Sequence, residues 1–356
     1  METAEQLLKE KYSRPANEEL YEVLGNGKVR CYSCGQQCLI SQGKAGTCKL
    51  KFNKNGVLYT PYGYVAGLAI DPIEKKPFFH VLPGETALSF GMLGCNFHCP
   101  FCQNWLSSQT LRDPNSLVRF EPISANTILD LALKHHSPVM VSTYNEPLIT
   151  SDWAFEIFSL AKEKGIICGY VSNGHASEKV LKFLRPVMQL FKVDLKTFQQ
   201  KNYDKLGGKL SVVCKTIEQL MELNYWVEIV TLLVPGFNDT DEELRELTKF
   251  IVKISPDIPW HVTGFYPNYK MNDAFPTAPH QLEKAYKIAK DSGLHFVYAG
   301  NRPGSVETME NTYCPHCSEL LIERTGFNVW TNKISDGRCP FCNTKIPGVW
   351  DTDSIN

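Results

Sequence analysis

The sequence predicts an α/β protein with a core that is a partial or complete (β/α) barrel, a cysteine-rich N-terminal segment and a C-terminal zinc-ribbon-like module. Short apolar segments alternate with amphipathic ones through the middle of the chain, a pattern typical of a parallel sheet covered by helices. Most of the cysteines gather near the two ends and in one central loop. The expected domains are residues 1–85, 86–302 and 303–356.

Seven segments of the middle region have the composition of buried strands: 87–93, 139–144, 166–171, 187–195, 226–234, 260–266 and 295–299. Most are continuously apolar, as expected for strands that are buried on both faces. Helix signals lie between them, such as Ser177 before EKVLKFL and the capping-box pattern that begins at Thr240. Because ligands of such folds bind at the carboxyl ends of the strands, we expect the functional residues there.

Length and charge exclude several classes of protein. A chain of 356 residues can bury a large core without disulfides. The formal net charge of -1 gives no basic bias toward nucleic acid. The charged N-terminus lacks the apolar core of a signal peptide, and no segment approaches the roughly 18 apolar residues of a membrane span. We therefore expect a cytoplasmic protein without membrane association, in which thiols stay reduced.

Eleven of the thirteen cysteines form three groups, and closely spaced cysteines in a reducing compartment usually bind metal or do redox chemistry. The other two, Cys168 and Cys214, lie in apolar or helical segments and are expected to be small buried hydrophobic residues. The segment before the barrel is rich in turn residues and is expected to be irregular.

The central group is Cys95, Cys99 and Cys102, with the spacing C-x3-C-x2-C directly after the first expected strand. Three thiolates on one loop suit an iron–sulfur cluster that keeps one iron open, whereas a structural zinc site needs four ligands. A zinc knuckle completed by His98 is the alternative.

The two outer groups each contain four cysteines. The C-terminal group has two C-x2-C pairs and predicts a zinc ribbon, with a rubredoxin-like iron site as the alternative: Cys314, Cys317, Cys339 and Cys342. The N-terminal group could bind zinc, which is slightly favoured, or a second 4Fe–4S cluster, or remain uncoordinated: Cys31, Cys34, Cys38 and Cys48.

The central triplet, with Phe101 just before its last cysteine, resembles the radical S-adenosylmethionine (radical SAM) superfamily. Four further motifs of that superfamily follow at expected strand ends: Tyr144–Pro147, Ser172–Gly174, Asp194–Lys196 and Val234–Gly236. The last two are similar to the Asp-x-Lys and Val-Pro-Gly motifs of pyruvate formate-lyase activating enzymes. Two features depart from that group, because Val171-Ser172 replaces its usual Asp-Thr and no arginine precedes Val234 in the fifth strand.

The full layout resembles the radical SAM branch of the AmmeMemoRadiSam system over residues 30–350. The segments that carry this likeness are the N-terminal cysteines with Gly46–Cys48, the loop GMLGCNFHCPFCQNW, the segment TYNEP, and Ile346–Val349. The family name reflects an association with Memo-like and AMMECR-like proteins, which are therefore expected associates.

The resemblance implies that a 4Fe–4S cluster on the triplet cleaves SAM to methionine and a 5′-deoxyadenosyl radical, which abstracts hydrogen from a substrate. It also implies the residues that position SAM: Tyr144, Asn145, Glu146, Ser172, Asn173, Asp194 and Lys196. The implied partners are a one-electron reductant of the flavodoxin or ferredoxin type and a protein substrate, by analogy with the activation of glycyl-radical enzymes.

Two alternatives to this function stay open. One keeps the radical chemistry and gives it a nucleic-acid or small-molecule substrate. The other is a non-catalytic iron–sulfur or zinc-ribbon protein that transfers electrons or binds a partner. His261, in the sixth expected strand, is equally consistent with a core residue and with a substrate contact.

Overall fold

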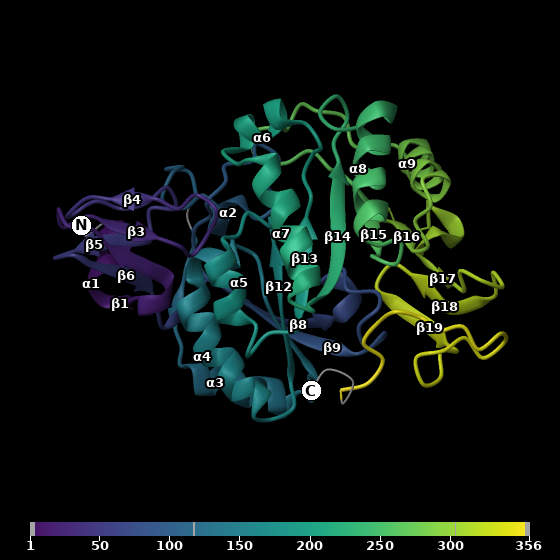
Figure 1. Cartoon of the computed structure of the whole chain (residues 1–356), viewed down its shortest axis with the longest axis horizontal. Helices are drawn as coiled ribbons and strands as arrows, with labels where there is room; N and C mark the ends of the chain where they lie inside the picture. Colours follow the sequence, from purple (N-terminus) through teal and green to yellow (C-terminus); the bar gives the residue numbers. More distant parts are fainter. Residues whose placement is uncertain (1–3, 117, 303, 353–356) are drawn as a thin grey trace.

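The computed structural model describes residues 4–116, 118–302 and 304–352, which form one large sheet with a smaller lobe at each end (Figure 1). The sheet has the strand order β16-β15-β14-β13-β12-β11-β9-β8. Its strands are β8 (Gly67–Pro72), β9 (Thr86–Gly91), β11 (Val139–Ser142), β12 (Ile167–Ser172), β13 (Leu190–Asp194), β14 (Trp226–Leu233), β15 (Trp260–Gly264) and β16 (Val297–Gly300). All seven expected strands are present and pair in parallel, while β8 is antiparallel to β9. Because β8 and β16 are the two edges, the barrel is partial.

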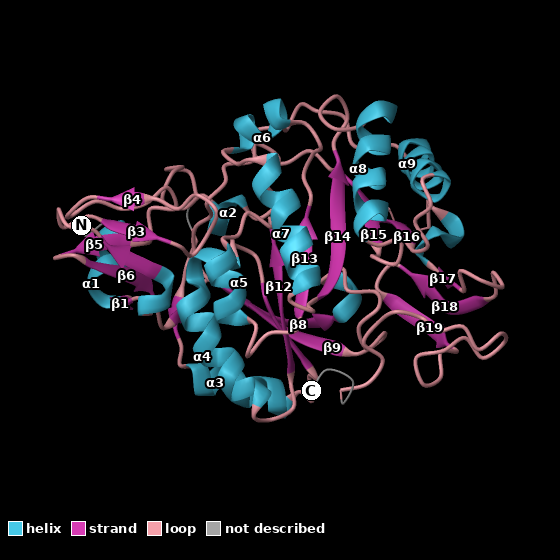
Figure 2. Ribbon diagram, in the orientation of Figure 1, coloured by secondary structure: helices cyan, strands magenta, loops and turns pink. Residues whose placement is uncertain are grey.

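Most of the helices that connect these strands lie together on one side of the sheet, whereas the short helix α6 lies beyond the strand ends (Figure 2). They are α2 (Trp105–Ser108), α3 (Ala125–Lys134), α4 (Ser151–Lys162), α5 (Glu178–Leu184), α6 (Gln200–Leu206), α7 (Leu210–Glu222), α8 (Asp241–Ile254) and α9 (Pro279–Asp291). The expected N-caps form, since Ser177 accepts from the backbone N–H of Val180 and Thr240 from that of Glu243. The capping box at Thr240 is only half formed, because the Glu243 carboxylate instead accepts the Phe198 N–H at 2.7 Å.

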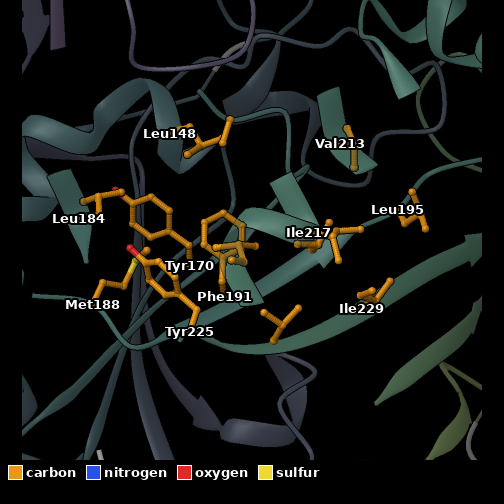
Figure 3. Packing of buried hydrophobic residues seen from close by; sticks show 14 of the residues in the cluster. Leu148, Tyr170, Leu184, Met188, Phe191, Leu195, Val213, Ile217, Tyr225 and Ile229 are labelled. Atoms are coloured by element: carbon orange, nitrogen blue, oxygen red, sulfur yellow. The ribbon is translucent and has the colours of Figure 1, made fainter. Parts of the chain in front are cut away.

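The main core lies between the strands and this helix layer (Figure 3). Tyr170 on β12, Phe191 on β13 and Ile229 on β14 are fully buried against Leu184 of α5 and Ile217 of α7. Each large apolar side chain buried in this way contributes on the order of 1.5–3 kcal/mol to the free energy of folding. The strands are therefore rigid enough to fix the positions of the residues that follow them.

From its sequence we expected an irregular N-terminal segment. The structure shows instead that it consists mainly of short strands and turns. It contains α1 (Ala4–Lys11), β1 (Ser13–Pro15), β2 (Tyr21–Val23), β3 (Val29–Cys31), β4 (Leu39–Ile40), β5 (Phe52–Lys54), β6 (Val57–Pro61) and β7 (Tyr64–Val65), which pairs with β10 (Glu121–Pro122). Two three-stranded antiparallel sheets result, β1-β6-β5 and β2-β3-β4. Strands of two to five residues between turn residues leave no periodic pattern, which is why the sequence does not reveal them.

A buried ion pair attaches this N-terminal lobe to the barrel. The Lys51 ammonium lies 2.5 Å from the Asp152 carboxylate, and the two side chains are 1% and 2% exposed. The other oxygen of Asp152 accepts the backbone N–H of Asn17 at 2.7 Å, and Thr60 donates to the same carboxylate at 3.0 Å. Asp152, in the first turn of α4, therefore joins that helix to the lobe.

The C-terminal lobe is a three-stranded antiparallel sheet of β17 (Thr312–Tyr313), β18 (Leu320–Thr325) and β19 (Asn328–Asn332). After it the chain returns to the segment that leads into β9. The backbone N–H of Val349 donates to the carbonyl of His80 at 2.7 Å, and that of Leu82 donates to the carbonyl of Val349 at 2.8 Å. Arg324 of β18 is buried and donates to the carbonyl of Phe79 at 2.7 Å.

No helix in the described ranges is both long enough and apolar enough to cross a membrane.

The Lys51–Asp152 pair yields a test of this architecture. Replacing Asp152 by Asn should lower the free energy of unfolding by roughly 3–5 kcal/mol, because the buried Lys51 ammonium would lose the carboxylate with which it pairs. Urea unfolding of the wild type and the variant measures this loss. The same change at Asp241, an exposed residue that pairs with Lys284 at 2.8 Å, is the matched control and should have little effect. Equal behaviour of the two variants would contradict the anchoring role.

Candidate active site

The carboxyl ends of the parallel strands surround a cavity of about 520 Å³. The three thiols of the central loop line it, and so do all seven side chains that the sequence assigns to SAM: Tyr144, Asn145, Glu146, Ser172, Asn173, Asp194 and Lys196. Residues spread over a hundred positions of the chain thus face one space. Their role as SAM contacts remains a prediction.

The loop after β9 holds the triplet through its own backbone. Phe97 donates its N–H to the sulfur of Cys95 at 3.3 Å, and the sulfur of Cys102 lies 3.3 Å from the Ser108 hydroxyl. Burial raises the pKa of Cys99 to about 12, although the nearby Lys196 ammonium opposes the shift. A bound metal supplies the positive charge that such a thiol needs in order to ionise.

The triplet is not arranged for a single zinc ion. Zinc with Zn–S bonds of about 2.3 Å holds its sulfurs about 3.8 Å apart. Among the residues that the structure describes, only the C-terminal cysteines form a group of metal-binding side chains with all ligand atoms within 4.8 Å. His98 is exposed and lies beside Gly207 at the end of α6, so a zinc knuckle completed by His98 is not supported.

Glu146 is the centre of the hydrogen-bond network at the ends of β11 and β12. One carboxylate oxygen accepts the Ser172 hydroxyl at 2.7 Å and the Leu148 N–H at 3.0 Å, and the other accepts the Asn173 N–H at 2.9 Å. Burial raises the pKa of Glu146 to about 7 despite these hydrogen bonds. The carboxylate therefore faces the cavity in a form that titrates near neutral pH.

Asn173 connects this network to the triplet loop. Its side-chain nitrogen donates to the Asn96 oxygen at 2.7 Å, and its oxygen accepts the His175 N–H at 3.0 Å. Gly174 follows with a φ of 68°, and a Cβ there would come within 2.6 Å of Val193. Glycine at this position is therefore required by both backbone conformation and space.

Tyr144 and Asn145 stabilise the strand ends that border the cavity. The Tyr144 hydroxyl lies 2.8 Å from that of Ser89, and the residue has a φ of 70°. The Asn145 oxygen accepts the backbone N–H of Met92 at 3.0 Å, and its nitrogen donates to the carbonyl of Glu146 at 3.2 Å. The Val234–Gly236 motif does not line the cavity, because it closes a turn in which the Asn238 oxygen accepts the Val234 N–H at 2.7 Å.

A row of charges follows β13. The Asp194 carboxylate lies between two ammoniums, that of Lys196 at 2.6 Å and that of Lys192, with which it is in direct contact. Burial alone would raise the pKa of Asp194, but the two lysines outweigh it and lower the pKa to about 2. Burial lowers the pKa of Lys192, whereas Asp194 outweighs burial at Lys196 and raises its pKa.

Lys192 is a cavity residue that the sequence reasoning missed. A strand places every second residue on the same face, so Lys192 shares its face with Asp194. The segment Lys-Val-Asp-Leu-Lys shows this alternation. The alternation would have predicted that Lys192 lies on the same face as Asp194.

His261, for which the sequence is consistent with a core residue or a substrate contact, is buried and also lines the cavity from β15. Its Nε2 lies 2.7 Å from the Glu228 carboxylate, and both side chains are buried. Burial lowers the pKa of His261, so the neutral ring donates Nε2–H to the carboxylate. Glu228 also accepts the backbone N–H groups of Phe79 and His80 at 2.9 Å each.

The two outer cysteine groups differ in geometry. In the C-terminal group the sulfurs of Cys314 and Cys342 are 3.5 Å apart, and those of Cys317 and Cys339 are 3.6 Å apart. These separations are close to those of tetrahedral zinc, so the group fits a bound metal ion. The N-terminal four line a separate small cavity and do not converge within 4.8 Å.

Comparison with known proteins identifies the family. A family model for the radical SAM superfamily matches residues 91–251. Over 330 residues the chain is 37% identical to an uncharacterized protein of Methanocaldococcus jannaschii, and the alignment covers 92% of this chain and 97% of that protein. The chain belongs to the radical SAM superfamily.

Two further proteins are similar to this chain. A pyruvate formate-lyase-activating enzyme of Listeria monocytogenes is 27% identical over 213 residues, which are 54% of this chain and 82% of that enzyme. The solved structure of Streptococcus suis SuiB bound to precursor peptide SuiA has a TM-score of 0.49 and 16% identity, and covers 64% of this chain and 51% of that one. The expected resemblance to activating enzymes is confirmed, and this radical SAM protein is an enzyme. Membership in the superfamily implies a 4Fe–4S cluster and SAM as its cofactors.

The geometry of the C-terminal group predicts that the radical SAM enzyme carries zinc there. Replacing Cys317 and Cys342 together by Ala should remove a zinc ion from the purified protein, because only two thiolates would remain. Elemental analysis of the full-length protein measures the loss. The matched control is Cys168→Ala, which removes a buried thiol outside the groups and should leave the zinc content unchanged. Iron instead of zinc at this site would contradict the prediction.

Proposed function

We propose that Cys95, Cys99 and Cys102 hold the 4Fe–4S cluster of a radical SAM enzyme that acts on a protein substrate. The observation that carries this proposal is the convergence of three reduced thiols and the seven predicted SAM contacts on one cavity. Three protein ligands leave one iron free for SAM. The chemistry supplied when both groups are bound is the one-electron cleavage of SAM to methionine and a 5′-deoxyadenosyl radical, which abstracts hydrogen atoms.

The residues of this chain bind and orient the ends of SAM. The ammonium of Lys196 suits the SAM carboxylate, and Asp194 holds that ammonium in place at 2.6 Å. The Glu146 carboxylate suits the SAM amino group, while Ser172 and the Asn173 N–H fix the orientation of that carboxylate. Asp194 keeps Lys196 charged, because two opposite charges in a buried site stabilise each other.

The walls of the cavity suit a reaction that must exclude water. Phe101, Val171, Val230 and Leu232 line it between the polar groups. Apolar side chains disfavour water in the part of the cavity that they line, which protects a reactive species from side reactions. The protein thus shields the chemistry that its cofactors perform.

Two observations support a protein as the substrate. The Listeria relative is named as an activating enzyme for another enzyme, pyruvate formate-lyase. The β18–β19 hairpin of the C-terminal lobe reaches the cavity, because Gly326 and Phe327 line it, and Trp330 on the same hairpin is 62% exposed. An exposed aromatic surface beside the cavity suits the docking of a polypeptide. We also propose that the enzyme receives electrons from a reductant of the flavodoxin or ferredoxin type. Memo-like or AMMECR-like proteins are its proposed associates.

Loss of one triplet cysteine tests the cluster assignment. Cys99→Ala should abolish formation of 5′-deoxyadenosine from SAM under dithionite after anaerobic reconstitution, because the cluster loses one of three protein ligands. Chromatography of the products measures this. Cys168→Ala is the matched control and should retain the activity. If the reconstituted wild type forms no 5′-deoxyadenosine, the proposed chemistry is wrong; if Cys99→Ala also loses zinc, Cys99 belongs to a zinc site.

The pKa of Glu146 predicts how SAM binding depends on pH. This pKa is about 7, so lowering the pH from 7.5 to 6 should protonate most of the carboxylate. Affinity for SAM should fall by about eightfold, since only the ionised form attracts the SAM amino group. Calorimetric titration of the reconstituted enzyme at both pH values measures the change. Glu146→Gln should bind weakly at both, and an unchanged pH dependence in that variant would assign the titration to another group.

Deuterium transfer tests the class of substrate. Each class of candidate molecule, labelled with deuterium and incubated with reconstituted enzyme and SAM, is examined for deuterated 5′-deoxyadenosine. We expect transfer from protein. Transfer from nucleic acid or a small metabolite alone would overturn the protein assignment while leaving the radical chemistry intact.

A further inference from the structure

The N-terminal lobe contains a second cysteine-lined cavity, separate from the active site. Its walls include four thiols and the side chain of Asn96: Cys31, Cys34, Cys38 and Cys48. Asn96 directly follows Cys95 of the triplet, and it lines this cavity but not the active-site cavity. The two cavities therefore lie on opposite sides of one short segment.

Both polar groups of Thr47 lie against one of the four sulfurs. Thr47 donates its backbone N–H to the sulfur of Cys38 at 3.4 Å, and its hydroxyl lies 3.3 Å from the same sulfur. Hydrogen bonds of this kind favour the thiolate form, which is the form that binds metal.

The spacing of these sulfurs distinguishes a cluster from a single ion. No three of them lie within 4.8 Å of one another, in contrast to the C-terminal group. The sulfurs around a zinc ion, each about 2.3 Å from its centre, are about 3.8 Å apart. The N-terminal sulfurs are spaced more widely than a single tetrahedral ion requires, which favours a larger, polynuclear centre.

The charge around the cavity suits an anionic centre. Lys51 lines the cavity, is 1% exposed and lies close to Cys31 and Cys48. Burying several thiolates costs much less when a buried ammonium is nearby. Asp152 holds that ammonium in position.

Asn96 presents an unused hydrogen-bond donor. The orientation of its amide is fixed, because Asn173 accepts the His175 N–H through its oxygen and must donate to Asn96 through its nitrogen. The Asn96 oxygen is therefore occupied, and its nitrogen, in a residue that is fully buried, has no hydrogen-bond partner. A buried donor without an acceptor is costly and indicates a missing partner. Sulfide or thiolate sulfur in the adjacent cavity would accept from it.

We propose that the four N-terminal cysteines hold a second iron–sulfur cluster, ligated by four thiolates and hydrogen-bonded by the side-chain nitrogen of Asn96. Four protein ligands leave it no open iron, so it does not bind SAM. This site goes beyond the proposed function, since its existence does not depend on whether the triplet cleaves SAM.

The test removes the triplet and counts the iron that remains. A full-length variant with Cys95, Cys99 and Cys102 all replaced by Ala is reconstituted anaerobically and analysed for iron, zinc and acid-labile sulfide. We expect about two to four irons per chain with matching sulfide, and an electron paramagnetic resonance signal on reduction. Adding Cys38→Ala and Cys48→Ala should remove both, whereas adding the matched change Cys214→Ala should not.

Two outcomes overturn the proposal. A second zinc ion per chain without iron in the triplet variant, in addition to the zinc of the C-terminal group, would assign the N-terminal site to a single ion. Absence of iron together with no more zinc than the C-terminal group binds would show that these thiols are uncoordinated. A wild type that fails to cleave SAM counts against the proposed function only, because the iron count of the triplet variant does not depend on that activity.

A second measurement tests the contact with Asn96. Asn96→Leu in the triplet variant should shift the reduction potential of the remaining cluster to more negative values, since hydrogen bonds to cluster sulfur help to set the potential. Asn104→Leu, an exposed asparagine of the same loop that lines the other cavity, is the matched control. Equal potentials in the two variants would rule out the Asn96 contact.

Discussion

The hydrogen bonds to the Glu146 carboxylate are the interaction on which the active site depends. Glu146 follows β11, Ser172 ends β12, and Asn173 continues from β12 to Asn96 beside the triplet. The backbone N–H of Glu146 donates in turn to the carbonyl of Gly94 at 3.2 Å, in the loop after β9. Three strand ends are thereby tied to one residue. A buried carboxylate is costly unless its hydrogen bonds are made, so the network forms as a unit.

The charged groups divide the cavity into regions with different properties. The Lys192–Asp194–Lys196 row after β13 carries a net positive charge, and Glu146 lies at the adjoining strand ends. His261 borders the same space from β15 but is neutral. Such separation of charge in a site of low dielectric orients a zwitterionic ligand in one direction only. Binding and orientation thus follow from the order of the strands.

The sequence was sufficient to predict the barrel and most residues that line the cavity. It was not sufficient to predict the hydrogen bonds and ion pairs between the side chains. Continuous apolar segments predicted all seven parallel strands, and strand ends predicted the residues that face the cavity. The antiparallel strand β8 was missed, because it ends in Asp71-Pro72, which is a turn signal, and Pro72 is tolerated only since the strand is at an edge. The pairing of Asn96 with Asn173 could not be predicted, because it depends on how two loops meet in space. The alternation of side chains along a strand could have predicted that Lys192 faces the cavity. It could not have predicted that Asp152 binds Lys51.

The return of the C-terminal segment to His80 and Leu82 affects how this protein is made. Val349 follows every strand of the barrel in the sequence, yet it hydrogen-bonds to the segment that leads into β9. A protein chain is made from its N-terminus, so all strands of the barrel are synthesised before this partner of His80 and Leu82 exists. The newly made barrel therefore passes through a stage in which it is uncovered at this point.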